Sequence, residues 1–195
     1  ALEPAAEMAV ISSRPMLEQR IQQQFFESAD LLSHTAETLS RPIADAAQTL
    51  LGCITAGGKV MLCGSGPAAS LAQHGAALMV GRFERERPGL AAMAVGGESE
   101  VRALGAPGDV LLAVSAGSPT PALIAAVQAA QAKDMTVVAL TGHDAAGLAD
   151  RLTETDVHIA VPHERAARHH ETHTLVLHCL CDAVDLQLLG EQEPT

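Results

Sequence analysis

Aromatic side chains are almost missing from this sequence. Its 195 residues include no Trp, no Tyr and three Phe, so aromatic residues make up only 2% of the chain. Hydrophobic residues still reach 48%, which is typical of a folded domain with a core of Ala, Val, Leu and Ile. Because single-stranded nucleic acids are bound by stacking bases on aromatic rings, this composition argues against that class of function.

Positive charge is also scarce. Twelve Lys and Arg stand against 23 Asp and Glu, which gives a formal net charge of −11. Binding to duplex DNA needs clustered basic side chains, so we expect no direct contact with nucleic acid. No apolar run approaches the roughly 20 residues of a membrane span, and residues 1–15 do not resemble a secretory signal. We therefore expect a cytoplasmic protein that does not enter a membrane.

The four cysteines show no disulfide framework. They are Cys53, Cys63, Cys179 and Cys181. We expect all four to be small buried apolar residues in a protein of a reducing compartment.

Five short β-rich runs alternate with helical patterns through most of the chain. The runs are Val60–Cys63, Ala91–Val95, Val110–Ser115, Thr136–Leu140 and Val157–Val161. This alternation indicates an α/β protein with a five-stranded, parallel, doubly wound sheet flanked by helices. The length suits one domain, which we place at residues 16–190 between an N-terminal tail (1–15) and a C-terminal tail (191–195).

Long helices are expected at both ends of this domain. The N-terminal part predicts one helix over Pro15–Leu39 and a second that begins at Ser40 as N-cap, with Pro42 in its first turn. The second helix should stop at Gly57-Gly58. A last long helix is predicted over Ala167–Leu189.

The connection from Val95 to Val110 is too short for its predicted role. A parallel crossover needs a dozen or more residues and usually a full helix, but only Glu98–Leu104 can be helical here. Either this crossover is abnormally short or residues are missing from it. A Cα–Cα step well above about 3.8 Å would reveal a break.

A glycine turn follows the first predicted strand and leads into a helix. Gly64 and Gly66 flank Ser65 at this turn, where glycine lets the backbone reverse sharply. The free N–H groups and the positive dipole end of the next helix point back at the turn, which suits a phosphate or another small anion. The alternative is a turn that only reverses the chain.

A second loop of this kind follows the third predicted strand. Ser115, Ser118 and Thr120 can offer hydroxyl groups to phosphate oxygens, and Thr120 also suits an N-cap. Pro119 and Pro121 remove two backbone donors. For this loop alone, the simpler explanation is a capped start of a helix. Open α/β sheets, however, bind ligands at the carboxyl ends of their strands, and both loops should lie there.

Several stretches resemble the SIS-domain family of phosphoheptose isomerases and DiaA proteins. Gly64–His74 is similar to the glycine loop and Ala-Gln-His motif of the family, and the last helix is similar through Arg168, Glu171, His173 and His178–Asp185. The other similar stretches are Gly81–Pro88, Arg102–Gly105, Gly108–Ser115 and Val138–Gly142. The resemblance covers roughly residues 16–190 apart from the short crossover, and implies the SIS fold and a homotetramer.

The resemblance also implies chemistry. The isomerases of the family convert sedoheptulose 7-phosphate to a heptose phosphate for lipopolysaccharide synthesis, and the reaction needs a base and an acid. The DiaA members bind the replication initiator DnaA. Carried over to this chain, the catalytic histidine is His178, and we add Glu171 as a substitute base. The expected phosphosugar-binding residues are Gly64, Ser65, Gly66, Arg82, Ser115, Ser118 and Thr120.

One departure from the family concerns the base. The family has a Glu four residues after the Ala-Gln-His histidine, and this chain has Leu78 there. Leucine can neither accept a proton nor bind a metal. The loops also differ, since Gly66-Pro67-Ala68 replaces Gly-Gly-Ser and the second loop keeps fewer hydroxyl groups.

Zinc is the cofactor that the resemblance suggests, because some members hold it with equivalent residues. Here the candidate ligands are His74, His178 and His170, with His170 coming from a neighbouring subunit because it lies about 12 Å along the helix from His178. His169 and His173 are four residues apart and can share a helix face. The alternative is that these histidines are solvated or lie at subunit interfaces.

Three functions follow from these observations. Leu78 leads us to expect first a DiaA-like adaptor that binds DnaA and has a degraded isomerase site. The alternative is an active phosphoheptose isomerase that uses Glu171 or a zinc-bound hydroxide as base, and a third function is a sugar-phosphate sensor. For an adaptor, the leucines Leu186, Leu188 and Leu189 either complete the core or form an exposed docking patch.

Overall fold

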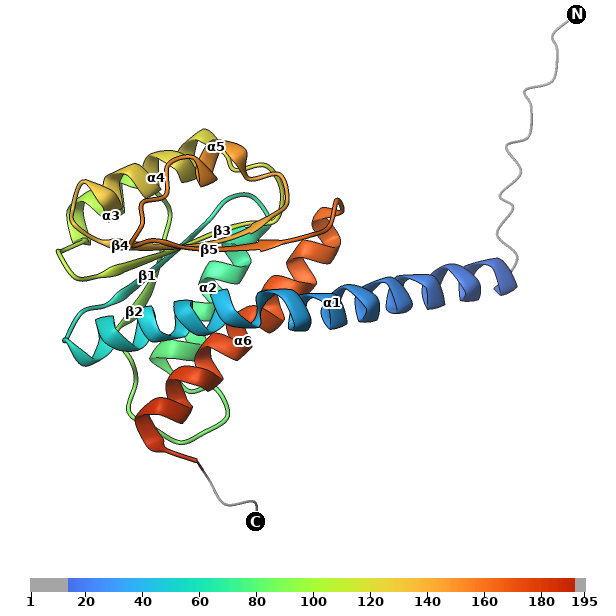
Figure 1. The fold of residues 1–195 in the computed structure, drawn as a ribbon, viewed down its shortest axis with the longest axis horizontal. Coiled ribbons are helices and arrows are strands. Elements are labelled where there is room, and N and C mark those ends of the chain that lie inside the picture. The colour runs from blue at the N-terminus through green and yellow to red at the C-terminus, as the bar shows by residue number, and fades with distance from the viewer. Residues whose placement is uncertain (1–13, 192–195) are drawn as a thin grey trace, which may run out of the picture.

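A five-stranded, entirely parallel sheet lies at the centre of the protein (Figure 1). The structure is a computed structural model and describes residues 14–191. The strand order is β2-β1-β3-β4-β5. The strands are β1 Val60–Gly64, β2 Ala92–Val95, β3 Val110–Ser115, β4 Thr136–Gly142 and β5 Val157–Val161. This arrangement confirms the predicted α/β class and the five predicted strands.

Helices cover both faces of the sheet. They are α1 Arg14–Thr55, α2 Ala68–Val80, α3 Glu98–Leu104, α4 Pro121–Gln131, α5 Ala146–Ala149 and α6 Ala166–Leu189. The helices α1, α2 and α6 lie on one face, and α3, α4 and α5 lie on the other (Figure 1). The two long helices at the ends of the domain, α1 and α6, pack against each other.

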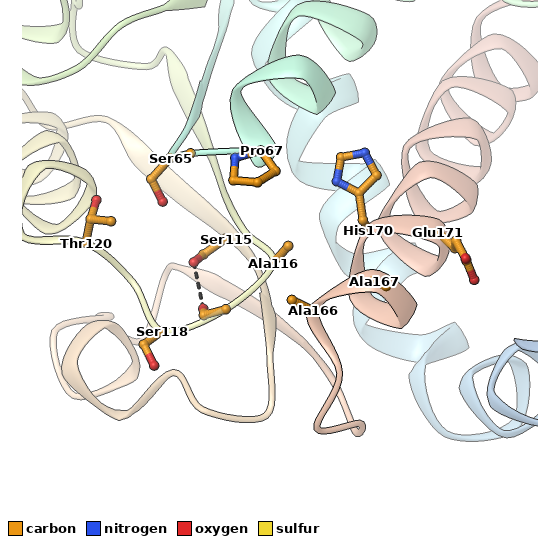
Figure 2. A pocket seen from close by; sticks show the side chains of 12 residues that line it. Ser65, Pro67, Ser115, Ala116, Ser118, Thr120, Ala166, Ala167, His170 and Glu171 are labelled. Atoms are coloured by element: carbon orange, nitrogen blue, oxygen red, sulfur yellow. Dashed lines mark hydrogen bonds between the residues drawn. The ribbon is translucent and has the colours of Figure 1, made fainter. Parts of the chain in front are cut away.

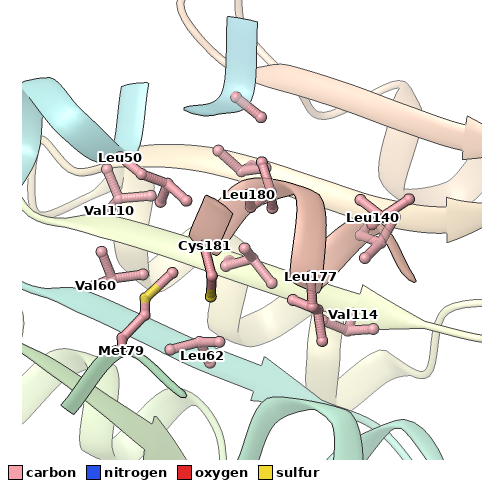
Figure 3. Packing of buried hydrophobic residues seen from close by; sticks show 14 of the residues in the cluster. Leu50, Val60, Leu62, Met79, Val110, Val114, Leu140, Leu177, Leu180 and Cys181 are labelled. Carbon is pink, nitrogen blue, oxygen red and sulfur yellow. The ribbon is translucent and has the colours of Figure 1, made fainter. Parts of the chain in front are cut away.

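Successive strand residues point to opposite faces, so each face has its own core. Leu62, Val114 and Leu140 face the side of α1, α2 and α6, where Leu177 and Leu180 pack onto them (Figure 3). On the other side, α4 packs a row of alanines against strand residues. Both faces of the central strands are therefore buried, as expected for a parallel sheet.

The prediction of two N-terminal helices was wrong, because α1 is one continuous helix from Arg14 to Thr55 with Pro42 inside it. The Ser40 hydroxyl is not an N-cap, since it donates to the carbonyl of Ala36 one turn earlier. Pro42 removes one N–H group from the helix. Packing of α1 against α6 and β5 holds the helix through this point.

The crossover between β2 and β3 is short. Its helix is α3, Glu98–Leu104, as predicted, and its first turn follows Gly97 directly. Its residue Val101 is completely buried and joins the core under α4. The chain therefore passes β1 with a helix of seven residues.

Three of the four cysteines are buried, but Cys179 is exposed, which corrects the prediction for that residue. It lies on α6, one residue beyond His178, and faces away from the core. All four thiols are free. Burial raises the pKa of the Cys63 thiol to about 11, so this thiol stays protonated at neutral pH.

The ends of the predicted domain lie near the limits of the described residues. The helix α1 already includes Arg14 and Pro15, while the rest of the predicted tail 1–15, and residues 192–195 of the other tail, lie outside the described range. The leucines that close α6, Leu186, Leu188 and Leu189, are each more than a third exposed and do not complete the core. Across residues 14–191, no helix is long and apolar enough to cross a bilayer.

Candidate functional site

The two predicted loops meet at one cavity. They follow β1 and β3, which are neighbours in the sheet, so their carboxyl ends lie side by side. The cavity has a volume of about 670 Å³ and is lined by Ser65–Pro67, Ser115–Ser118, Thr120, Ala166, Ala167, His170 and Glu171 (Figure 2). Five of the seven residues predicted to bind a phosphosugar line it, and Gly64 lies directly before Ser65.

The first loop depends on its two glycines. Gly66 has a φ of 57°, in the left-handed region that favours glycine. Gly64 lies so close to the backbone of Ala68 that a Cβ atom at this position would overlap it. The loop therefore turns directly from β1 into α2, as the sequence predicted.

The second loop begins with Ser115 and ends in the capped start of α4. Thr120 is the N-cap, and its hydroxyl oxygen accepts a hydrogen bond from the N–H of Leu123 at 3.3 Å. The Ser115 hydroxyl donates to the carbonyl of Gly117 at 2.7 Å (Figure 2), and the Ser118 hydroxyl donates to Asp144. The three predicted hydroxyl groups are thus present, each with a partner inside the protein.

Unused backbone donors also line the cavity. Within residues 14–191, the N–H groups of Gly66, Gly117, Ser118 and Thr120 donate to no protein acceptor. Backbone N–H groups are strong donors that need a partner, and a cluster of them attracts an anion. The cavity can therefore bind a phosphate group through backbone donors, even though Pro119 and Pro121 provide none.

The first turns of α6 form the other wall of the cavity. His170 is half-buried there, and Glu171 is exposed. The Glu171 carboxylate accepts hydrogen bonds from Ser28 of α1 at 2.7 Å and from Arg168 at 2.6 Å. In Figure 2 its side chain points away from the two loops. The predicted substitute base is therefore at the cavity but is held by these two donors.

His74 and His178 come together, as the resemblance implied. Their Nε2 atoms are 3.1 Å apart, so one ring can donate a hydrogen bond to the other. Phe83 packs against His178 with a ring-centroid distance of 5.2 Å. Leu78, one turn after His74 on α2, is half-buried against the core under α6. The histidine pair thus lies beside an apolar side chain at the position of the missing base.

The spacing of the histidine pair can be compared with that of two zinc ligands. Two nitrogen ligands on one tetrahedral zinc ion, each at about 2.0–2.1 Å, lie only slightly farther apart than these two Nε2 atoms. Catalytic zinc sites use three protein ligands, and no group of three or more His, Cys, Asp or Glu able to hold a metal occurs in the described part of one protomer. One protomer therefore does not complete the predicted set of His74, His170 and His178.

Two arginines of the segment after α2 have different surroundings. Arg82, a predicted binding residue, is more than half exposed and pairs with Glu86 rather than lining the cavity. Arg87 is buried and pairs with the buried Asp185 of α6. The sequence showed only a charged run here, so it did not indicate which arginine is buried.

Two further histidines of α6, His169 and His173, are buried. The Nδ1 of His169 is 2.8 Å from the carbonyl oxygen of Ala116. His173 is 3.1 Å from the carbonyl oxygen of Thr141. Burial, with a smaller effect of the neighbouring histidines, lowers the pKa of His173 to about 4, so this ring is neutral. The spacing of four residues indicated a shared helix face, but nothing in the sequence showed that this face is buried.

Known proteins match both the sequence and the fold. The sequence profile of the SIS domain matches residues 24–142. A phosphoheptose isomerase of Methylibium petroleiphilum is 59% identical, over 92% of this chain and 99% of the relative. A DnaA initiator-associating protein DiaA of Klebsiella pneumoniae is 42% identical, over 89% of this chain and 98% of the relative.

A solved structure agrees with these matches. The phosphoheptose isomerase GmhA of Neisseria gonorrhoeae superposes with a TM-score of 0.81 at 37% identity, covering 87% of this chain and 98% of that protein. The long α1 and α6 helices around a parallel sheet are thus a shared architecture. The chain therefore belongs to the SIS-domain family, in the group formed by the phosphoheptose isomerases and the DiaA proteins.

Proposed function

We propose that this protein is a sugar-phosphate isomerase of the phosphoheptose type. The observation that carries the proposal is the set of unused N–H groups of Gly66, Gly117, Ser118 and Thr120 around one cavity. They suit the phosphate of a sugar phosphate. The name of the 59% identical relative points to a phosphoheptose, so we propose sedoheptulose 7-phosphate as substrate.

The histidine pair can serve the proton transfer. An aldose–ketose shift removes a proton from one carbon and returns one to its neighbour, which requires a positioned acid–base group. His178 lies two helical turns from His170, and His170 lines the phosphate cavity. The reacting carbons of a long sugar phosphate lie far from its phosphate, so we propose that they reach His178, with His74 as its hydrogen-bonded partner.

The comparisons favour this function over the DiaA-like adaptor that Leu78 led us to expect first. The most similar of the relatives named above is a phosphoheptose isomerase at 59% identity, while the DiaA protein stands at 42%. Leu78 still favours the adaptor as a second candidate, since it replaces the expected base. In that case the protein would bind DnaA, as the name of the DiaA relative states for that protein.

The proposed enzyme is a cytoplasmic homotetramer. The exposed apolar side chains on the first half of α1, such as Phe25 and Phe26, support an assembly. In an assembly, a neighbouring subunit can add His170 to the pair of His74 and His178, which would complete three zinc ligands. Zinc is therefore part of the proposal, and when bound it would act as a Lewis acid that polarises the carbonyl oxygen of the substrate.

The test is turnover of sedoheptulose 7-phosphate, followed by NMR with and without added zinc. We expect turnover that falls at least a hundredfold in His178→Asn. The matched control is His143→Asn, because His143 is an exposed histidine outside the cavity and the pair. Folded tetrameric protein without turnover would contradict the isomerase proposal.

The adaptor has its own test. Immobilised DnaA should retain the protein if the second candidate is correct, and the Leu78→Glu variant should bind equally well because it leaves the surface leucines of α6 unchanged. Loss of retention after deletion of residues 186–195 would place the contact on those leucines. Absence of retention in every variant would exclude the adaptor.

A further inference from the structure

We propose that His169 is a positioning residue that directs the N–H group of Gly117 into the phosphate cavity. The proposal rests on the proposed function, because it concerns the phosphate subsite of the same cavity. His169 is completely buried on α6, behind the loop that follows β3. Its Nδ1 atom lies 2.8 Å from the carbonyl oxygen of Ala116.

The link between His169 and the cavity is a single peptide unit. The carbonyl of Ala116 and the N–H of Gly117 belong to the same peptide, which is planar and trans, so the two bonds point in opposite directions. Because His169 holds the carbonyl from behind, the N–H of Gly117 points to the other side of the loop. Gly117 lines the cavity, and its N–H has no acceptor within residues 14–191, so it is available to a phosphate there.

The peptide would be free to rotate without this contact. Gly117 is exposed and lacks a side chain, so little else opposes a flip of the preceding peptide. The hydrogen bond from Ser115 goes to the next carbonyl, that of Gly117. Among residues 14–191, His169 is therefore the one partner of the Ala116 carbonyl. A flipped peptide would present a carbonyl oxygen to the phosphate and repel it.

The His169 ring is itself held on several sides. Its Nε2 faces the carbonyl oxygen of His163, and because a neutral imidazole carries one N–H, the proposal assigns that hydrogen to Nδ1, which faces Ala116. The ring stacks on His173 at a centroid distance of 6.1 Å. It also lies against Gly142, where a Cβ atom would overlap it. The ring of His169 therefore leaves no room at position 142 for a residue larger than glycine.

Two conservative variants separate the two ring nitrogens. In His169→Asn the amide nitrogen stands near the position of Nδ1 and can still donate to Ala116, whereas in His169→Gln it stands near Nε2 and can donate only to His163. We measure the dissociation constant of inorganic phosphate by ³¹P NMR. The Asn variant should stay within about threefold of the wild type, and the Gln variant should bind about tenfold more weakly, as expected for one hydrogen bond.

Further measurements keep the proposal testable if a substitution at 169 destabilises the protein. Gly142→Ala displaces the ring without removing it and should weaken phosphate binding about as much as His169→Gln. His143→Asn is the matched control, because His143 also bonds to the carbonyl of His163 but lies outside the cavity. Hydrogen exchange over residues 116–118 should be faster in the Gln variant than in the Asn variant.

The outcomes distinguish this proposal from the proposed function. Equal phosphate affinity in the Asn and Gln variants, with a wild type that binds, would overturn only the role of His169. A wild type that binds neither inorganic phosphate nor sedoheptulose 7-phosphate would overturn the phosphosugar site and the role of His169 with it.

Discussion

At the scale of single residues, Leu78 determines how this site differs from an ordinary acid–base site. It lies one turn after His74 on α2, where the two side chains share a helix face. Its side chain is half-buried against the core between α2 and α6. The residue therefore contributes to packing and provides no proton acceptor beside the histidine pair.

Replacing Leu78 with Glu should restore a base beside His74. We expect Leu78→Glu to raise kcat for sedoheptulose 7-phosphate by about a hundredfold or more, which is the usual contribution of a positioned base. Leu78→Gln is the control, since it matches the size of Glu but takes no proton. Both variants should lose about 1–2 kcal/mol of stability in urea unfolding because they remove apolar burial. Equal kcat in the two variants would contradict the prediction.

The buried His173 makes stability depend on pH. Its pKa is lowered to about 4 in the folded state, below the ordinary value of 6.5, so the unfolded chain binds the proton more readily. The contribution of neutral His173 to the free energy of unfolding is therefore fully present above about pH 6.5 and is lost as the pH falls towards 4. Between pH 7 and pH 5 the wild type should lose about 1–2 kcal/mol more in urea unfolding than His173→Gln. Equal losses would show that His173 is not the group responsible.

At the scale of elements, Arg87 holds three segments together. It pairs with Asp185 of α6 and donates to the carbonyls of Leu78 and Met79 at the end of α2. It also donates to the carbonyls of Gly81 and Pro88 in the segment that follows. Both charged side chains are almost completely buried. This cluster fixes α2 relative to α6, the two helices that carry His74 and His178.

Removing Asp185 should therefore be costly. Asp185→Ala leaves the Arg87 charge buried without its partner, which typically costs about 3–5 kcal/mol. The exposed pair of Arg82 and Glu86 is the control, and Glu86→Ala should change stability by less than about 1 kcal/mol. Urea unfolding measures both. A loss in Asp185→Ala no larger than that in Glu86→Ala would contradict a role for this ion pair.

At the scale of the whole molecule, the first half of α1 extends beyond the rest of the domain (Figure 1). Its exposed apolar side chains are Met16, Leu17, Ile21, Phe25 and Phe26. Phe25 is 72% exposed, which is unfavourable for a large aromatic side chain in water. These side chains are the best candidates for contact with further copies of the chain.

Charges on this segment should disrupt the assembly. We expect wild-type protein to elute as a tetramer in size-exclusion chromatography with light scattering, and Phe25→Asp combined with Phe26→Asp to give smaller species. The control is Leu104→Asp, which changes an exposed leucine on α3, far from α1 in the fold. A double variant that remains tetrameric would exclude this part of α1 from the interface.

The sequence by itself determined the strands and the loops of this protein. Strands that are buried on both faces appear in the sequence as short apolar runs. Gly64, Gly66 and Thr120 indicate turns and a helix start through local backbone preferences. These elements could therefore be predicted without knowledge of the fold. The continuity of α1 through Pro42 could not be predicted from the sequence, because packing against α6 and β5 overrides the local preference of proline for a break in the helix.

Only the tertiary structure decided which polar groups meet. Three contacts join residues that are far apart in the chain. They are the contacts of His74 with His178, of Arg87 with Asp185 and of His169 with Ala116. The family resemblance and the charges in the sequence indicated some of these residues. Neither indicated which side chains are buried or which residues they contact. Local patterns predict local backbone geometry, whereas contacts between distant residues depend on how helices pack over the sheet, and that packing decides which side chains form the site.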